Sequence, residues 1–415
     1  MAERSSTLIA PIPTPSTVKA PTSRVLSVDI LRGITIAFMI LVNDAGDSSH
    51  VYTQLEHASW NGCTLTDLVF PTFLFVVGVS IILSLYSRLQ RGSSRRELAM
   101  HTVRRSLTIF IVAMLINLIP FFRFTHLRIY GVLTRIAVCY LIAGLICIVT
   151  QKARNLLAIT ATLLISYWLL MRFVPVPGLG VPTHDIPLLD PDLNLAAWID
   201  RGINDFLQST IHTGRLYEKT RDPEGLLSTI PAIGTALLGA VAGLWLRRAD
   251  GKPTLITRGQ CAMGLLLSGL VGIASGLLWN IWFPINKKLW TSSYVLFAAG
   301  CALIGLALCY WLVDIRRFNE TKAGKWLTWP WLVFGTNAIV AYTVAALVEK
   351  TLFLIHMSSL GPNGKPLSGW GWVYWHIFAV NGSTNFTSAA FAFAFVLVCF
   401  IPNLILWRKR IFVKL

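Results

Sequence analysis

Long apolar runs separated by short polar segments dominate the pattern of this chain. Ten of these runs are about as long as the roughly 20 residues that an α-helix needs to cross a bilayer. They cover residues 26–45, 67–87, 105–122, 131–150, 155–174, 226–246, 261–282, 290–313, 329–349 and 387–407. The pattern predicts an all-α polytopic integral membrane protein with about ten transmembrane helices.

The remaining segments divide the chain further. Residues 351–360 and the aromatic-rich 370–378 are too short or too polar to span, and we expect them to be interfacial or re-entrant. Residues 1–23 hold Pro, Ser and Thr without the apolar core of a cleavable signal peptide, so they are predicted to be a disordered cytoplasmic tail. Residues 24–415 then form one transmembrane domain. Its longest polar connection, 175–225, is predicted to be a long extracytoplasmic loop and a candidate lid.

Charge sets the orientation. The 415 residues are 54% hydrophobic and 13% charged, with a net charge of +17. With ten spans and the N-terminus inside, the inner loops and both tails hold 23 Lys and Arg, whereas the longer outer loops hold 10. This asymmetry is the positive-inside pattern of membrane proteins. It predicts that both termini are cytoplasmic, and it argues against nucleic acid as a partner.

The seven cysteines do not have the spacing of a disulfide framework or a metal site. Six of them lie in or at the ends of apolar runs, and the chain contains no CxxC motif. Buried packing is the usual role of such residues. We therefore expect no metal.

Ionisable residues inside spans are costly and often functional. Asp67 enters the second run from outside, and Arg135 lies one turn into the fourth from the same side, which predicts an ion pair near the outer mouth. Asp29 and Arg32 share a helix face near the inner end of the first run. They are either a pair at the membrane interface or a functional pair.

Several motifs resemble, in the same order, the heparan-α-glucosaminide N-acetyltransferase family. The most specific is "HASWNG" followed by "TDLVFP", within "EHASWNGCTLTDLVFPTFLFVVG" (56–78). The others are "SVDILRG" (27–33), "RIYGVLTRIAVCY" (128–140), "DPEGLLSTIPAIGTALLGAVAG" (222–243), "INKKLWTSSYVL" (285–296) and "FGTNAIVAY" (334–342). The resemblance covers most of the chain from about residue 24 to residue 350.

The resemblance implies a transfer of acetyl from cytosolic acetyl-CoA to the amine of a terminal glucosamine across the membrane. The family histidine matches His57, as a general base or as the carrier of a transient acetyl group. The family asparagine matches Asn43, which would position the substrate or stabilise the oxyanion. We expect Asp67 to orient His57.

The chemistry suits these residue types. An amine that attacks a thioester must lose a proton, and histidine has an intrinsic pKa near neutrality. Histidine can also act as a nucleophile and split the transfer into two steps. The oxyanion needs a donor, which Asn43 or Asn286 would supply.

The binding residues are expected on two sides of the membrane. Arg32, Arg104, Arg105, Arg247 and Arg248 are candidates for the CoA phosphates on the inner side, although the positive-inside rule alone would explain them. Trp60, Asn61, Asn286 and Lys287 are candidates for the acceptor on the outer side. The polar connection "FPINKKLWTSSY" (283–294) either anchors the interface or lines a site with His57.

Two other functions fit the same pattern. One is a sugar or glycan transporter without chemistry, and the other is an O-acetyltransferase of cell-surface polysaccharide. The expected partners are acetyl-CoA, an amino-sugar or glycan acceptor, the lipid bilayer and a second copy of the chain. With no large lumenal domain before the first run, we expect a bacterial inner membrane protein whose catalytic loop is periplasmic.

Overall fold

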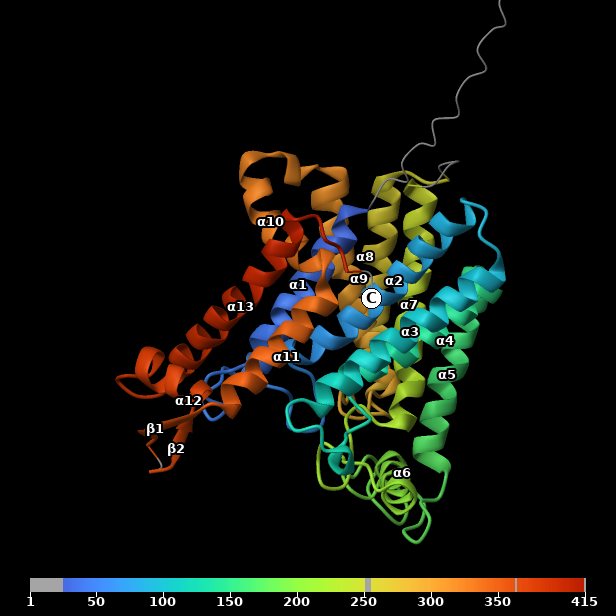
Figure 1. The fold of residues 1–415 in the computed structure, drawn as a ribbon. Helices are drawn as coiled ribbons and strands as arrows, with labels where there is room; N and C mark the ends of the chain where they lie inside the picture. The colour runs from blue at the N-terminus through green and yellow to red at the C-terminus, as the bar shows by residue number, and fades with distance from the viewer. Residues whose placement is uncertain (1–24, 251–254, 363, 414–415) are drawn as a thin grey trace, which may run out of the picture.

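The apolar runs form the helices of a bundle in the computed structural model, which describes residues 25–250, 255–362 and 364–413 (Figure 1). The predicted tail, residues 1–23, lies outside these residues. The long helices are α1 (Leu26–Asn43), α2 (Leu65–Leu89), α3 (Arg95–Leu118), α4 (Val132–Val149), α5 (Ala153–Phe173), α6 (Leu195–Ile211), α7 (Leu226–Asp250), α8 (Arg258–Trp279), α9 (Ser292–Tyr310), α10 (Lys322–Thr336), α11 (Ala338–Leu354) and α13 (Asn385–Arg408). Strands β1 (His356–Leu360) and β2 (Pro366–Ser368) form a small hairpin before the short helix α12 (Gly369–Val373).

Nine helices among the described residues are long and apolar enough to cross a membrane, and a bent pair brings the number to ten. The prediction of an all-α polytopic membrane protein is therefore confirmed. The pieces 351–360 and 370–378 form no spanning helix of their own, although residues 351–354 are the end of α11.

The ninth predicted span, 329–349, is not one straight helix. The chain bends by 80° between α10 and α11, at Asn337. The side chain of Asn337 donates to Ile411 O (3.1 Å) and accepts from Val413 N (2.9 Å), so it ties the break to the C-terminal segment. Asparagine favours such breaks because its amide competes with the backbone for hydrogen bonds.

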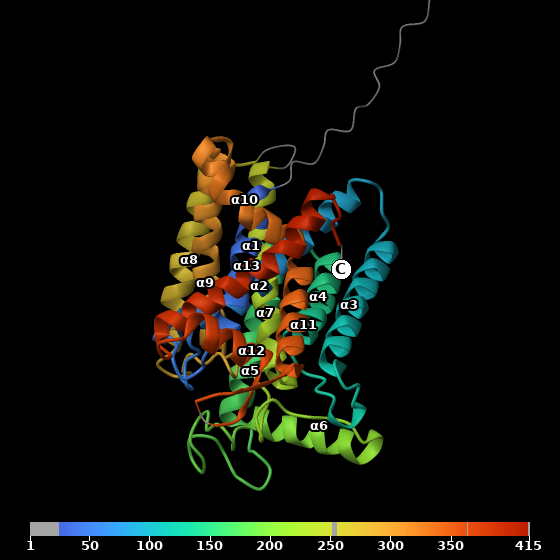
Figure 2. The same cartoon turned by 60° about the vertical axis from the view of Figure 1, so that its left-hand side comes forward.

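The predicted loop 175–225 is not entirely irregular, because it contains α6. This helix lies across the end of the bundle rather than along it (Figure 2). Asn194 caps its start by accepting a hydrogen bond from Ala197 N (2.9 Å), and Leu195, Ala196 and Ala197 are buried. We call this end of the molecule, with α6 and the connections 44–64, 212–225 and 280–291, the α6 face. The opposite end, with 90–94, 150–152 and 316–321, is the basic face.

Glycines bring α2 to the centre of the bundle. A Cβ atom on Gly78 would lie 1.8 Å from Ala236 O of α7, and one on Gly239 would lie 1.9 Å from Phe75 O of α2. The two backbones therefore touch, which only glycine allows at these positions. This packing fixes α2, whose first turn, with Asp67, lies at the α6 face.

Candidate active site

Asp67 occupies the first turn of α2 and organises the loop before it. One of its carboxylate oxygens accepts from Thr64 N (3.0 Å), from the Thr64 hydroxyl (3.1 Å) and from Ala58 N (3.1 Å). A carboxylate at this helix position satisfies backbone N–H groups that have no partner inside the helix. These hydrogen bonds fold the 57–64 loop back onto the first turn of α2.

The other oxygen of Asp67 holds His57. His57 Nδ1 lies 2.6 Å from Asp67 Oδ1, so the loop brings the predicted base and the predicted orienting residue into contact. Because a carboxylate only accepts, the proton of the neutral ring is on Nδ1 and the lone pair is on Nε2. The His57 side chain is 40% exposed, whereas that of Asp67 is 1% exposed. Asp67 therefore fixes the Nδ1 side of the His57 ring, while part of the ring stays exposed.

Two other histidines on the α6 face also pair with aspartates, and they differ in one respect. His50 Nδ1 lies 2.9 Å from Asp47, and His184 Nδ1 lies 2.6 Å from Asp185. Those carboxylates are 20% and 41% exposed. A carboxylate shielded from water attracts an imidazolium more strongly than a solvated one. Among these three pairs, His57 with Asp67 is the one whose carboxylate is shielded from water.

The polar connection between α8 and α9 packs against this loop. Gly62 N donates to Ile285 O (2.8 Å), and Asn286 Nδ2 donates to Asn61 Oδ1 (3.2 Å). Asn286 is fully buried. Tyr294 at the start of α9 donates to the backbone oxygen of Asp67. Residues 283–294 therefore pack against the loop that holds His57, and whether they line a site with His57 stays a prediction.

Trp60 lies at the edge of the same loop. Its indole N–H donates to Leu189 O (2.8 Å). The Arg221 guanidinium lies 4.7 Å from the ring centroid and the Lys288 ammonium lies 5.9 Å from it, both in cation–π geometry. Trp60 thus joins the 57–64 loop to the long connection 175–225.

The predicted ion pair between Asp67 and Arg135 is wrong. Asp67 is engaged by His57, Thr64 and Ala58, as described above. Arg135 instead donates to Gly225 O (3.1 Å) and to the Ser228 hydroxyl, and it lies 5.0 Å over the Trp290 ring. Similar depth in the membrane did not bring the two side chains together, because they point to different neighbours.

Sequence reasoning missed a charged cluster around Arg128. Its guanidinium donates to both oxygens of Asp222 (2.7 and 2.6 Å) and to Glu224 (2.7 Å). These carboxylates raise the pKa of Arg128 further, despite its burial. The signal was available, because opposite charges stand at the start of the 128–140 and 222–243 motifs.

Lys287 completes the polar region. Burial lowers the pKa of Lys287, and the carboxylates of Glu224 and Asp67 offset this only in part. Burial would raise the pKa of Glu224, but Lys287, Arg128 and Arg135 outweigh it and lower that pKa. The site therefore combines an exposed imidazole with buried charges of both signs, an arrangement suited to a polar ligand and to proton transfer.

The loop with His57 and Asp67 lies within a match to a known family. Residues 24–284 match the catalytic domain of heparan-alpha-glucosaminide N-acetyltransferase. The chain belongs to this family. It is 31% identical over 377 residues to the Mus musculus heparan-alpha-glucosaminide N-acetyltransferase, and 32% identical over 368 residues to that of Homo sapiens. These matches cover 81% and 79% of this chain and 55% and 53% of the relatives, so the chain spans about half their length.

The family's predicted asparagine, Asn43, is exposed at the end of α1 on the α6 face. Within the described part of the chain, no hydrogen bond joins it to His57. Its role stays a prediction.

The five candidate CoA arginines lie on three helices. Arg32 of α1 donates to Asp29 (2.9 Å), Ser80 Oγ (2.6 Å) and Gly335 O (3.2 Å), so it links α1 to α2 and α10. On α3, Arg104 is exposed and Arg105 lies 4.8 Å over the Tyr140 ring. On α7, Arg247 lies over Tyr86 and Arg248 over Trp245. The five arginines therefore have different partners on different helices, and their role in CoA binding stays a prediction.

Proposed function

We propose that this chain is a transmembrane N-acetyltransferase. It would move the acetyl group of cytoplasmic acetyl-CoA to the amine of a glucosamine-type sugar or glycan on the other side. The observation that carries the proposal is the His57–Asp67 pair, which lies inside the segment matched by the catalytic family. The curated relatives are named for transfer of acetyl to a glucosaminide amine.

The orientation rests on the loop charges. The connections of the basic face and both tails carry most of the Lys and Arg, which favours a cytoplasmic position for that face. The α6 face, with His57, would then be extracytoplasmic. In a bacterial inner membrane it would face the periplasm.

In the direct route, His57 Nε2 removes a proton from the acceptor amine as its nitrogen attacks the thioester carbonyl. The C–N bond forms, the C–S bond breaks, and the thiolate of CoA leaves. The proton on His57 passes to this thiolate and gives CoA with a free thiol. Asp67 stabilises the imidazolium between these two proton transfers, as carboxylates do in histidine-based catalysis.

In the two-step route, His57 Nε2 attacks the thioester itself. The C–S bond breaks, CoA leaves as its thiolate, and the acetyl group is carried on the imidazole. In the second step the amine displaces the imidazole, its proton passes to the freed Nε2, and that proton finally neutralises the CoA thiolate. The Asp67 hydrogen bond serves both routes, because each passes through an imidazolium-like ring.

The neighbouring residues would shape the acceptor side. We assign Lys287 to the carbonyl oxygen, because a partly buried cation that interacts with Asp67, the partner of the base, would stabilise a developing oxyanion. Asn61 and Asn286 would hold the 57–64 loop around the acceptor, and Trp60 would form the rim of the acceptor site. Asn43 remains a second candidate donor.

For the CoA phosphates we favour Arg104 and Arg105 over Arg32, because the contacts of Arg32 tie three helices together.

A turnover assay tests the proposal. Purified protein in detergent receives radiolabelled acetyl-CoA with and without glucosamine. His57→Ala should abolish N-acetylglucosamine formation, and Asp67→Asn should lower kcat by about 10²–10⁴-fold. Label on the wild type without acceptor, absent in His57→Ala, would select the two-step route.

The matched controls are His184→Ala and Asp185→Asn, which change a second His–Asp pair on the same face. The His184 side chain is 84% exposed, so both controls should keep wild-type turnover. Full activity in His57→Ala would overturn the assignment. An O-acetylated product would change the acceptor from an amine to a hydroxyl. Absence of acetyl-CoA binding would favour the alternative function, a sugar or glycan transporter.

A further inference from the structure

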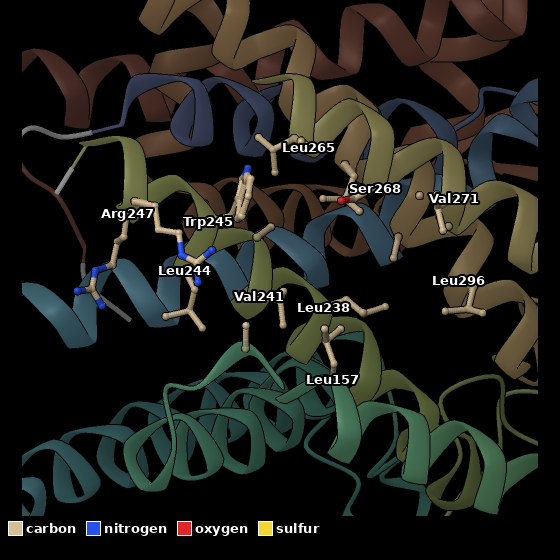
Figure 3. Close-up of a pocket in the computed structure, with 18 of the residues that line it drawn as sticks. Leu157, Leu238, Val241, Leu244, Trp245, Arg247, Leu265, Ser268, Val271 and Leu296 are labelled. Atoms are coloured by element: carbon tan, nitrogen blue, oxygen red, sulfur yellow. The ribbon is translucent and has the colours of Figure 1, made fainter. Parts of the chain in front are cut away.

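A large cavity lies away from the active site, between α5, α7, α8 and α9 (Figure 3). Its volume is about 800 Å³, within the range of about 300–1,000 Å³ that is typical of ligand pockets. Its walls are mainly apolar, with Leu157, Leu238, Val241 and Val271 among them. Leu157 and Val271 are exposed, so the cavity opens sideways, toward the membrane. Most of its lining lies in helices long and apolar enough to span the membrane, so lipid would contact the open side of the cavity.

The cavity is a groove with the length of an acyl chain. Its lining on α7 runs from Leu238 to Arg248, and on α8 from Gly264 to Ser275. At 1.5 Å per residue these stretches are about 15 and 17 Å long. One leaflet of a bilayer has a hydrocarbon layer of roughly 15 Å. The groove therefore accommodates at least one chain of a single leaflet.

One end of the groove is basic. Arg247 and Arg248 belong to the lining, at the basic face, and Figure 3 shows Arg247 and Trp245 toward one end and Val271 and Leu296 toward the other. Both guanidinium groups lie on aromatic rings, and neither forms an ion pair with a carboxylate among the residues that the structure describes. Arg247 Nε is buried without a hydrogen-bond partner in the same residues. By contrast, Arg258 at this face pairs with Asp250 (2.8 Å).

Helix α7 separates most of this groove from α2, of which Tyr86, near the C-terminal end, belongs to the lining. Gly239 and Gly243 of α7 face α2, while Val241 and Trp245 line the groove. Two residues along a helix correspond to a rotation of about 200°, so these two sets lie on opposite sides of α7. The groove is thus a site distinct from the one around His57 and Asp67.

We propose that this groove binds an anionic phospholipid of the cytoplasmic leaflet. One acyl chain lies along α7 and α8, and the phosphate lies between Arg247 and Arg248. Charge complementarity selects the occupant, because two cations without carboxylate partners face the interface beside a lipid-open apolar channel. Basic pockets between transmembrane helices on the cytoplasmic side bind anionic headgroups in this way. The inference uses the orientation inferred from the loop charges and does not require acetyl transfer.

Native mass spectrometry of the purified protein tests the proposal. The wild type, mixed with equal amounts of phosphatidylglycerol and phosphatidylcholine, should retain phosphatidylglycerol. Each arginine contributes about fivefold to affinity for an anionic lipid, so Arg247→Gln with Arg248→Gln should bind it roughly thirtyfold more weakly. Replacing both by Lys should restore most of the binding. Arg95→Gln with Arg96→Gln, an exposed arginine pair at the same face, is the control and should bind like the wild type.

A second pair of variants tests the channel without changing charge. Ser268→Trp fills the groove and should release the bound lipid, whereas Leu267→Trp, one residue around the helix and outside the lining, should not. The proposal is overturned if Arg247→Gln with Arg248→Gln retains as much lipid as the control Arg95→Gln with Arg96→Gln. The proposal also fails if acetyl-CoA displaces the lipid from the wild type and no longer binds to Arg247→Gln with Arg248→Gln. A change of oligomeric state in Ser268→Trp with unchanged lipid would assign the groove to a second copy of the chain.

Discussion

At the scale of single residues, Asp67 links the start of a helix to the orientation of the base. The same carboxylate accepts from the backbone that opens α2 and from the ring of His57. A buried carboxylate is costly unless its oxygens are hydrogen-bonded, and here each oxygen has a donor. Any change that frays the first turn of α2 therefore also moves His57.

Asp200 of α6 is a second buried carboxylate, and here the cost of burial outweighs the hydrogen bonds. It accepts hydrogen bonds from Leu226 N (3.2 Å) and Asp222 N (3.4 Å), but burial dominates and raises its pKa from 3.8 to about 7. Between about pH 4 and pH 7 the folded protein keeps this proton and the unfolded chain releases it. The free energy of unfolding should therefore fall as the pH rises through this window, by up to about 4 kcal/mol.

The Asp200→Asn variant lacks this titration. Thermal unfolding in detergent, followed from pH 4 to pH 8, should show the Tm of the wild type falling relative to that of the variant up to about pH 7. Above that pH the two curves should run parallel. Parallel curves over the whole range would show that Asp200 is ionised in the folded protein throughout.

The sequence could point to His57 and Asp67 but not to all of their neighbours. The capping position fixes Asp67 locally, and His57 lies in the loop that this cap folds back. The partners of Arg135 depend on the rotation of α4, which an apolar run without a clear polar face does not specify. Those of Arg128 depend on how the loop before α4 packs against the segment before α7. This is why the pairing of Asp67 with Arg135 was wrong and the pairing of Arg128 with Asp222 was missed.

At the scale of elements, length and hydropathy located the spanning helices well, because each must satisfy its backbone internally over the bilayer thickness. Two elements were missed for local reasons. The break at Asn337 arises from one side chain inside an apolar run. Helix α6 is hidden by its polar residues, since only one narrow face of it is buried.

The contact between α2 and α7 gives a prediction at this scale. Gly78→Ala would place a methyl group 1.8 Å from the Ala236 carbonyl oxygen, so the helices must move apart. Overpacking of this kind costs about 1–3 kcal/mol, and the Tm in detergent should fall. Gly259→Ala in α8 is the control, because its Cβ meets nothing within 4 Å. It should be neutral or stabilising, and an unchanged Tm in Gly78→Ala would mean that the helices are not in backbone contact.

At the scale of the whole molecule, the chain has two polar ends with different contents. The α6 face holds the imidazole and the mixed charges around Glu224, while the basic face holds Arg247 and Arg248 in the last turn of α7. Arg104 and Arg105 lie near the middle of α3. A protein that joins acetyl-CoA on one side to an acceptor on the other needs such a division. The fold provides it with α2 as the central link, since Asp67 begins this helix and Arg88 ends it.

Sidedness is the property on which this division depends, and cysteine labelling measures it. In a Cys63→Ser background, His184→Cys on the α6 face should react with a membrane-impermeant maleimide in intact cells. Arg91→Cys, exposed on the connection between α2 and α3, should react only after permeabilisation. The six other cysteines are buried or half-buried and serve as the unlabelled background. The reverse pattern would place His57 on the side where acetyl-CoA is made, and the transfer would then need no passage across the bundle.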